Sequence, residues 1–262
     1  MSKVIAIANQ KGGTGKSVTA CNLGIGLVRS GKRVLIIDAD SQGSLSASLG
    51  VEEPDELDIA LHTIIGKIVN DEEFDVDLGI MHHEEGVDFL PCNIELAGLE
   101  QSLINVISRE HILKNYINMQ ADRYDYIIID CMPSLGVVTI NALTAADTVL
   151  IPVQASYLPI KGLQQLLVTI GKVRRHLNPS LTIEGILFTM VDARTNFSRN
   201  IIEKLKEAYG ENVDFFSTDI PKSVRAEETT AEGKSIYSYD PKGKVSKAYE
   251  ELVKEVLAND IV

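Results

Sequence analysis

The sequence has few cysteines and no long apolar run, and both absences exclude classes of protein. No 18-residue apolar run occurs in the 262 residues, so no transmembrane helix is expected. The three cysteines, Cys21, Cys92 and Cys131, are far apart and odd in number. This argues for a reducing cytosol and against a disulfide framework or a paired-cysteine metal site. Residues 1–3 lead directly into an apolar strand, so we expect neither a signal peptide nor an appended helix-turn-helix.

The negative charge is concentrated in one segment. A net charge of −12 spread evenly would disfavour a nucleic-acid binder. Residues 51–89, however, hold 13 Asp or Glu against Lys67 alone, and the rest of the chain balances 24 basic against 24 acidic residues. A local basic face elsewhere is therefore compatible with the composition. We expect an acidic surface excursion at about 51–89, with one amphipathic helix near 57–69.

Apolar, β-branched runs alternate with helix-compatible stretches along the chain. The runs are nearly continuous, which is typical of strands in a mostly parallel sheet covered by helices on both faces. The predicted strands are 4–8, 34–38, 87–91, 126–130, 148–153 and 185–189, and the predicted helices are 16–30, 101–121, 136–146, 161–176, 198–209 and 244–258. This alternation predicts a doubly wound α/β fold. With no interdomain linker in the sequence, we predict one domain over residues 1–262.

The most informative motif is the run N-Q-K-G-G-T-G-K-S at residues 9–17, directly after the first strand. A strand, a glycine-rich turn, Lys-Ser and a helix together build a nucleoside-triphosphate phosphate cradle. The glycines let successive N–H groups point inward, and the helix N-terminus adds its dipole and unpaired donors. Lys16 is predicted to reach the β- and γ-phosphates, and the Ser17 hydroxyl to ligate Mg²⁺. The predicted nucleotide-binding residues here are Lys11, Gly12, Gly13, Thr14, Gly15, Lys16, Ser17 and Val18.

Two further predicted strands end in carboxylates. The run I-D-A-D-S-Q-G at 37–43 places Asp38 and Asp40 one residue apart. Alternate residues of a strand point to opposite sides, so these two acids should have different roles. The run Y-I-I-I-D at 126–130 is a Walker B pattern, in which a buried strand delivers Asp130 to the sheet edge where Mg²⁺ lies.

The phosphate loop departs from the general pattern G-x-x-x-x-G-K-[ST], because residue 10 is Gln and a second lysine, Lys11, precedes the glycines. In this respect the segment resembles the deviant-Walker ATPases, which include ParA, MinD and the nitrogenase iron protein. The resemblance implies that Lys11 crosses a dimer interface to the partner's nucleotide and stabilises charge in the transition state. It also implies a P-loop NTPase fold of the deviant Walker A type.

The two acidic motifs carry the same resemblance. Residues 38–43 resemble the switch motif D-x-D-P-Q-G, with Ser41 in place of Pro, which implies that Asp40 orients the attacking water and Asp38 supports the metal. Residues 130–136 resemble D-x-P-P-S-L-G, with Met132 in place of the first Pro.

Three late segments are similar to the partitioning branch, the ParA/Soj proteins. They are T-M-V-D-A-R-T-N at 189–196, I-P-K-S-V-R at 220–225 and Y-D-P at 239–241. The similarity implies that Met190 and Pro221 wall the adenine and that arginines face nonspecific DNA. The implied DNA-facing residues are Arg194, Arg225, Lys222 and Lys247.

The resemblance spans nearly the whole chain and implies a ParA-type ATPase for plasmid or chromosome partitioning. ATP and Mg²⁺ would drive formation of a sandwich homodimer that binds nonspecific double-stranded DNA. A ParB-like centromere-binding partner would stimulate hydrolysis and reset the protein. We expect a cytoplasmic, nucleoid-associated, prokaryotic protein with no membrane partner.

Three alternatives belong to other classes. A MinD-like positioning ATPase at the membrane is disfavoured because the last predicted helix lacks a basic polar face. A metallocluster protein of the nitrogenase-reductase type is disfavoured because no cysteine pair is suitably placed. An amidoligase of the same superfamily is expected to carry extra substrate-binding segments that a chain of this length lacks.

Overall fold

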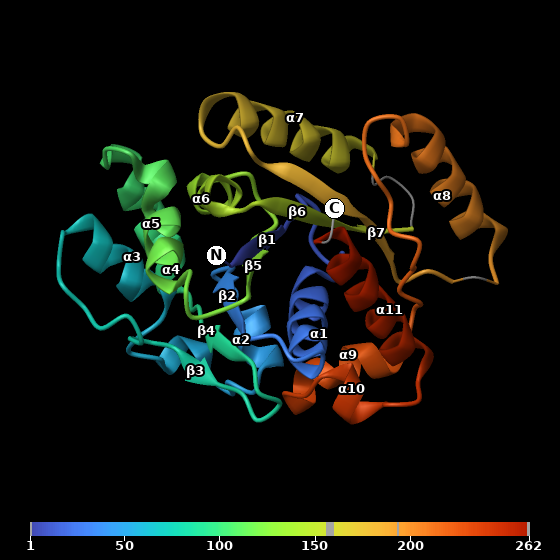
Figure 1. The fold of residues 1–262 in the computed structure, drawn as a ribbon, viewed down its shortest axis with the longest axis horizontal. Coiled ribbons are helices and arrows are strands. Elements are labelled where there is room, and N and C mark those ends of the chain that lie inside the picture. The colour runs from blue at the N-terminus through green and yellow to red at the C-terminus, as the bar shows by residue number, and fades with distance from the viewer. Residues whose placement is uncertain (1, 156–159, 193, 261–262) are drawn as a thin grey trace.

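A seven-stranded sheet runs through the molecule, in a computed structural model that describes residues 2–155, 160–192 and 194–260 (Figure 1). Its strands are β1 (Lys3–Ile7), β2 (Val34–Ala39), β3 (Met81–His82), β4 (Asp88–Leu90), β5 (Tyr126–Cys131), β6 (Thr148–Gln154) and β7 (Thr182–Thr189). Their order is β3-β4-β2-β5-β1-β6-β7, in which β3 pairs antiparallel with β4 and the other neighbours are parallel. The predicted doubly wound, mostly parallel sheet is confirmed.

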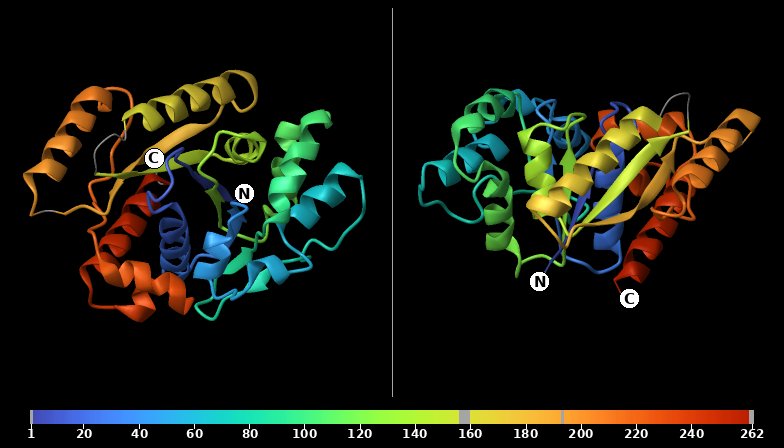
Figure 2. Two further views of the ribbon diagram at one scale, coloured as in Figure 1. Left: turned by 180° about the vertical axis from the view of Figure 1, so that it is seen from behind. Right: turned by 90° about the horizontal axis from the view of Figure 1, so that it is seen from above.

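Helices cover both faces of this sheet (Figure 2). They are α1 (Lys16–Arg29), α2 (Ser44–Ser48), α3 (Leu61–Val69), α4 (Glu95–Ser102), α5 (Ile112–Gln120), α6 (Val137–Ala145), α7 (Ile160–His176), α8 (Asn196–Tyr209), α9 (Val224–Glu232), α10 (Ile236–Tyr239) and α11 (Lys244–Asn259). Three 3₁₀ turns, η1 (Pro54–Glu56), η2 (Leu103–Asn105) and η3 (Arg109–His111), lie between helices of the described chain. Within the described ranges, none of the helices is long and apolar enough to cross a membrane.

The strands are apolar on both faces because each face packs against its own helical layer. In β1, Val4 and Ala6 enter the core shared with α3 to α8, while Ile5 and Ile7 enter the core shared with α1, α2, α10 and α11. Successive strand side chains point to opposite faces, so both must be apolar when both faces are covered. This explains the continuous rather than alternating apolar runs.

The helix predicted over 101–121 is wrong, because the chain is interrupted between α4 and α5. Ser108 has a left-handed backbone (φ 56°), and Ile107 is 92% exposed. A tertiary contact fixes where α5 begins: the side chain of Asn141 on α6 donates to the Arg109 carbonyl at 2.6 Å and accepts from the Leu113 amide at 3.1 Å. A residue about thirty positions later therefore overrides the local helical pattern.

The acidic segment 51–89 is not merely a surface excursion. Most of its carboxylates are exposed, but Leu61, Ile64 and Ile65 of α3 are buried in the core. Its last part also supplies β3 and most of β4, so the segment extends the sheet at one edge. The predicted helix near 57–69 begins at Leu61, after the 3₁₀ turn η1.

Candidate nucleotide site

The loop between β1 and α1 curls in the way its glycines allow. Gly13 and Gly15 have φ of 68° and 82°, in the left-handed region that other residues rarely adopt. Gly15 is the residue that immediately precedes α1, and its carbonyl accepts from the Thr19 amide at 2.9 Å. The first free N–H groups of α1 therefore border the cavity into which the loop opens, the arrangement that favours a bound phosphate.

Two buried side chains anchor this loop to neighbouring strands. Asn9 donates through Nδ2 to the Pro152 carbonyl of β6 at 2.7 Å. Thr189, at the end of β7, donates through Oγ1 to the Thr14 carbonyl at 2.8 Å. Both ends of the loop are thus tied to the sheet before any ligand binds.

Lys16 and Ser17 begin α1 beside the carboxylate of Asp130. Lys16 is buried and Ser17 is partly buried. Both oppose the rise in the pKa of Asp130 that burial and the charge of Asp38 cause. A lysine and a hydroxyl thus meet a carboxylate at the edge where the strands end.

Asp38 and Asp130 occupy matching positions on the adjacent strands β2 and β5. Asp38 is fully engaged: Oδ2 accepts from the Ser46 amide at 2.8 Å and the Ser46 hydroxyl at 2.7 Å, and Oδ1 accepts from the Asp40 amide at 3.1 Å. Burial raises the pKa of Asp38, and these hydrogen bonds oppose the rise. The switch segment is therefore held to the strand through Asp38.

Asp130 differs, because its two buried carboxylate oxygens have no close hydrogen-bond partner among the described residues, although the Ser17 hydroxyl lies near enough to lower the pKa of Asp130. A buried, unpaired carboxylate is costly unless a cation compensates it. Within the described ranges, no group of three or more His, Cys, Asp or Glu could hold a metal alone. The Asp130 carboxylate and the Ser17 hydroxyl are hard oxygen donors that fit Mg²⁺, which is usually bound by one or two carboxylates together with phosphate oxygens and waters.

Asp40 lies at the turn that follows β2. Its Oδ1 accepts from the Gln42 amide at 3.1 Å and its carbonyl accepts from the Gly43 amide at 2.9 Å, so the turn is compact. Asp40 is buried but lines the same cavity as the phosphate loop.

Two adjoining cavities collect most of the predicted nucleotide residues. The first, about 380 Å³, is lined by residues 12–18, Asp40, Gln42, Ser44, Ser48, Pro133, Met190 and Thr230. The second, about 310 Å³, is more apolar and is lined by Gly15, Val18, Thr189, Met190, Ile220, Pro221, Ser223, Ala226, Glu227, Thr230 and Tyr249. Gly15, Val18, Met190 and Thr230 border both, so a phosphate chain and a base can be held side by side.

Met190 holds a strained backbone at the junction of the two cavities. Its φ of 53° is in the left-handed region, which is uncommon outside glycine. The strand–strand contact between Val191 and Pro221 brings the predicted adenine-wall residues together. Strain of this kind often occurs at ligand sites.

The basic residues predicted to face DNA come from three segments after β7. Lys222 donates its amide to the Val191 carbonyl at 3.1 Å, which places it beside the loop that carries Arg194. Arg225 begins α9, and Lys247 lies in the first turn of α11. Ala193 of the predicted motif lies outside the described residues.

Both arginines are paired with a carboxylate of their own chain. Arg194 contacts Asp192 at 2.9 Å, and this hydrogen-bonded pair lowers the pKa of Asp192 to about 2. Arg225 contacts Asp240 at 2.8 Å. A phosphate would have to compete with each carboxylate, a feature that the sequence alone did not reveal.

Two residues that line the phosphate cavity, Ser48 and Thr230, belong to no motif in the sequence. Asn9 and Thr189 lie in the predicted motifs, but the motifs did not indicate that these two side chains hold the loop.

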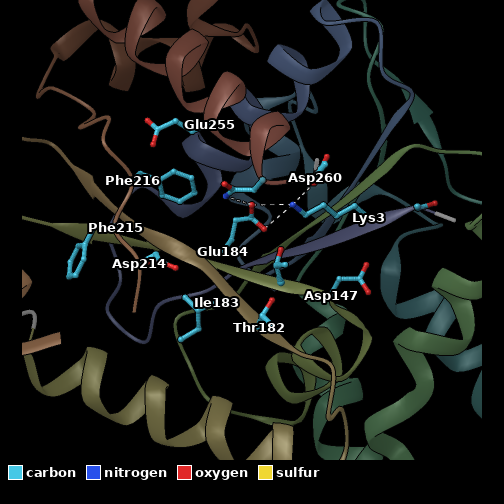
Figure 3. A pocket seen from close by; sticks show the side chains of 13 residues that line it. Lys3, Asp147, Thr182, Ile183, Glu184, Asp214, Phe215, Phe216, Glu255 and Asp260 are labelled. Carbon is cyan, nitrogen blue, oxygen red and sulfur yellow. Dashed lines mark hydrogen bonds and ion pairs between the residues drawn. The ribbon is translucent and has the colours of Figure 1, made fainter. Parts of the chain in front are cut away.

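A larger cavity of about 840 Å³ lies at the other end of the strands from the phosphate loop, where β1, β6 and β7 begin (Figure 3). Lys3 crosses it to Glu184 at 3.0 Å and to Asp260 at 2.6 Å. The pair with Asp260 joins the two ends of the described chain, and the pair with Glu184 ties the first strand to β7. None of the predicted site residues lines this cavity.

Comparison with known proteins agrees with the geometry. A protein-family model described as AAA domain matches residues 2–183. The sporulation initiation inhibitor protein Soj of Bacillus subtilis is 46% identical over 259 residues, covering 99% of this chain and 100% of Soj. The chromosome partitioning protein ParA of Myxococcus xanthus is 39% identical over 262 residues, covering 99% of this chain and 89% of that protein.

A solved structure extends the similarity to a nucleotide complex. Cobyrinic acid a,c-diamide synthase from Mycobacterium smegmatis, with bound ADP and magnesium, superposes with a TM-score of 0.85 at 36% identity, covering 99% of this chain and 95% of that one. We expected an amidoligase to carry extra substrate-binding segments that this chain lacks. The protein named as a diamide synthase has almost the same length as this chain, so the length does not argue against an amidoligase.

Proposed function

This chain belongs to the ParA/Soj family of partitioning ATPases that hydrolyse ATP with Mg²⁺, and on that premise we propose that it is an ATP-switched dimer that binds nonspecific DNA. One observation supports the nucleotide chemistry above the others. The unpartnered carboxylate of Asp130 faces Lys16 and Ser17 at the mouth of a glycine-rich loop. A metal and a phosphate chain supply the charges that this arrangement lacks.

Each predicted residue has a distinct role in this proposal. The loop amides of residues 12–17 and the Lys16 ammonium bind the phosphates, while Ser17 and Asp130 hold the metal. Mg²⁺, when bound, would neutralise charge on the phosphate oxygens. Asp40 would orient the attacking water, and Asp38 would support the site indirectly through Ser46, because its oxygens already accept three hydrogen bonds.

The open crest of the phosphate loop supports a dimer. Gly12 and Gly13 are exposed, and a Cβ atom added at either would meet nothing within 4 Å. A second copy of the chain can therefore approach the loop closely. Lys11, at the lip of this crest, would reach the partner's phosphates and stabilise charge in the transition state.

A basic strip defined by Arg194, Lys222, Arg225 and Lys247 would bind DNA. These four residues are exposed, and so are Lys242 and Lys244, which lie just before and at the start of α11. Contacts to phosphates are independent of sequence and weaken with salt. Two copies in a dimer double the number of contacts, so binding would depend on ATP.

A ParB-like partner bound to a centromere-like site would stimulate hydrolysis and release the dimer. The names of the relatives support this part of the proposal, because several of them, including ParA of Myxococcus xanthus, are named as chromosome partitioning proteins. Binding to nonspecific DNA would also place the protein on the nucleoid.

The test is a titration of duplex DNA of random sequence with ATP or ADP, at low and at moderate salt. Binding with ATP that is lost with ADP and weakens with salt is expected. Wild-type protein that ignores DNA with ATP at the lower salt would refute the DNA-binding role.

The structural similarity to a protein named as a diamide synthase supplies a second candidate, an ATP-dependent amide-forming ligase. The two functions differ in what turnover requires. A ligase needs an added carboxylic acid and an amine donor, whereas the partitioning ATPase turns over ATP with DNA and its partner protein alone.

A further inference from the structure

Asn9 is a buried polar residue placed immediately before the phosphate loop. It is only 5% exposed, and both ends of its side-chain amide are used. Nδ2 donates to the Pro152 carbonyl at 2.7 Å, and Oδ1 accepts from the Lys11 amide at 3.0 Å. One side chain thus connects strand β6 to the residue proposed to act across the dimer.

The bond to Pro152 fixes the point where the chain leaves the sheet. The last backbone bond of β1 with β6 in this region runs from the Ala8 amide to the Leu150 carbonyl at 3.1 Å. The Asn9 side chain then replaces the next backbone donor and reaches the carbonyl two residues further along β6. A buried hydrogen bond of this kind is costly to break, because the carbonyl would be left without a donor.

The bond to Lys11 closes an Asx turn, in which an Asn side chain accepts from the amide two residues later. Beyond Lys11 the backbone has less support. Gly12 and Gly13 have no side chains, and the Thr14 hydroxyl reaches the Lys11 carbonyl only at 3.4 Å. The turn that Asn9 makes therefore fixes the position of the Lys11 amide.

The other anchor of the loop acts at a different point. Thr189 holds the Thr14 carbonyl, next to Gly15 and Lys16, which bind the phosphates of the same chain. Asn9 thus holds the part of the loop that is proposed to reach the partner's nucleotide, and Thr189 holds the part that is proposed to bind the nucleotide of the same chain.

We propose that Asn9 is a positioning residue that aims Lys11 at the nucleotide of the partner subunit. This inference rests on the proposed role of Lys11 in the dimer. It predicts that loss of Asn9 impairs dimerisation and turnover while the monomer still binds its own ATP.

The experiment compares Asn9→Ala, Lys11→Ala and the double variant. ATP affinity is measured with a fluorescent ATP analogue at protein concentrations too low for dimers, and dimerisation by sedimentation with a non-hydrolysable analogue. Asn9→Ala is expected to weaken dimerisation and slow turnover by about tenfold, while monomer affinity changes by less than about threefold. The double variant should be no worse than Lys11→Ala, because the two residues act as one unit.

Asn178 provides a matched control for the loss of a buried asparagine. It is 3% exposed, and its Nδ2 donates to the carbonyls of Leu143 and Ala146 at 3.1 and 2.7 Å, near the start of β7 rather than at its nucleotide end. Asn178→Ala should lower the melting temperature without affecting ATP-dependent dimerisation. If it impairs dimerisation as strongly as Asn9→Ala, the effect is general destabilisation and the inference fails.

A serine variant tests the turn directly. Asn9→Ser keeps an oxygen that can accept from the Lys11 amide but is too short to reach Pro152, so it should recover part of the dimerisation lost in Asn9→Ala. A serine variant no better than alanine, or an additive double variant, would overturn the inference. Wild-type dimerisation and turnover in Lys11→Ala would instead refute the proposed role of Lys11 itself.

Discussion

Asp130 lies directly across from Asp38 in the register of β5 and β2, yet the two carboxylates have opposite hydrogen-bonding states. Asp38 accepts three hydrogen bonds from the switch segment, and Asp130 accepts none from the described residues. Two equivalent strand positions therefore provide one structural anchor and one carboxylate that needs a cation. The sequence motifs had assigned both Asp38 and Asp130 to the metal, whereas their hydrogen bonds distinguish the two.

Asp130→Asn should remove the metal response without unfolding the protein. The variant loses a buried charge that Lys16 and Ser17 offset only in part, so its melting temperature without nucleotide should equal or exceed that of the wild type. The extra stabilisation that Mg²⁺ gives over ATP with EDTA should disappear. Asp38→Asn is the matched comparison and should instead lower the melting temperature, because it disrupts the bonds to Ser46. A full Mg²⁺ response in Asp130→Asn would contradict its assignment.

Lys16→Ala should abolish binding of Mg·ATP, because the loop loses its buried phosphate-binding charge. At a ligand concentration 100 times Kd, the wild type gains about 2.7 kcal/mol of stability by mass action. The variant should gain almost none in a thermal-shift assay. An ATP-induced shift equal to that of the wild type would remove Lys16 from the site.

Lys11→Ala should leave most ATP affinity intact in the monomer but lose ATP-dependent dimerisation and hydrolysis. The reason is that its proposed target is the partner's nucleotide. Size-exclusion chromatography with ATP and a phosphate-release assay measure the two losses. Normal dimers with normal turnover would show that Lys11 has no role across the interface.

Asp40→Ala should still bind ATP and dimerise but should accumulate as a dimer that has not hydrolysed its ATP. If Asp40 only positions water, its loss should slow turnover by about 10²-fold. Single-turnover hydrolysis by the preformed dimer isolates this step. Rapid turnover in the variant is incompatible with the role given to Asp40.

Arg225→Glu should abolish ATP-dependent DNA binding while preserving dimerisation. Each dimer carries two copies of Arg225, so the milder Arg225→Ala should reduce the slope of log K against log salt by about 2 units.

Asp240→Asn should strengthen DNA binding, because the carboxylate that competes for Arg225 becomes neutral. Arg33 is a matched control, since its side chain is 60% exposed against 61% for Arg225 and pairs with Asp125. Arg33 directly precedes β2, at the end of the sheet where the parallel strands begin. DNA affinity that falls equally in Arg33→Glu would therefore refute a localised DNA face.

The sequence predicted the phosphate end of the site better than the rest, for a physical reason. The loop lies between a strand and a helix that are adjacent in the chain, so local spacing fixes its geometry. Asp130 was predictable because a continuous apolar run ends in one acid. The ATP and Mg²⁺ assignments and the fold class were confirmed by the family and structural comparisons.

The remaining features depend on contacts between distant segments. Ser48 and Thr230 line the cavity because α2 and α9 pack together, where a Cβ atom on Gly233 would lie 2.7 Å from Gly50. Such a close approach leaves no periodic signal in the sequence. The break near Ser108 likewise depends on Asn141 of another helix. The ion pairs of the arginines depend on turn geometry that spacing does not determine.

A nucleotide bound in the two adjoining cavities would have a mechanical role as well as a chemical one. The walls of the cavities come from the first strand–helix connection, from the segments that follow β2 and β5, and from the chain at and after the end of β7. The hydrogen bond between Thr14 and Thr189 spans 175 positions of sequence. A molecule seated in both cavities acts as a removable cross-link between the beginning and the last third of the chain. Hydrolysis and release would cut that link, so nucleotide exchange is also a cycle of stiffening and loosening of the fold.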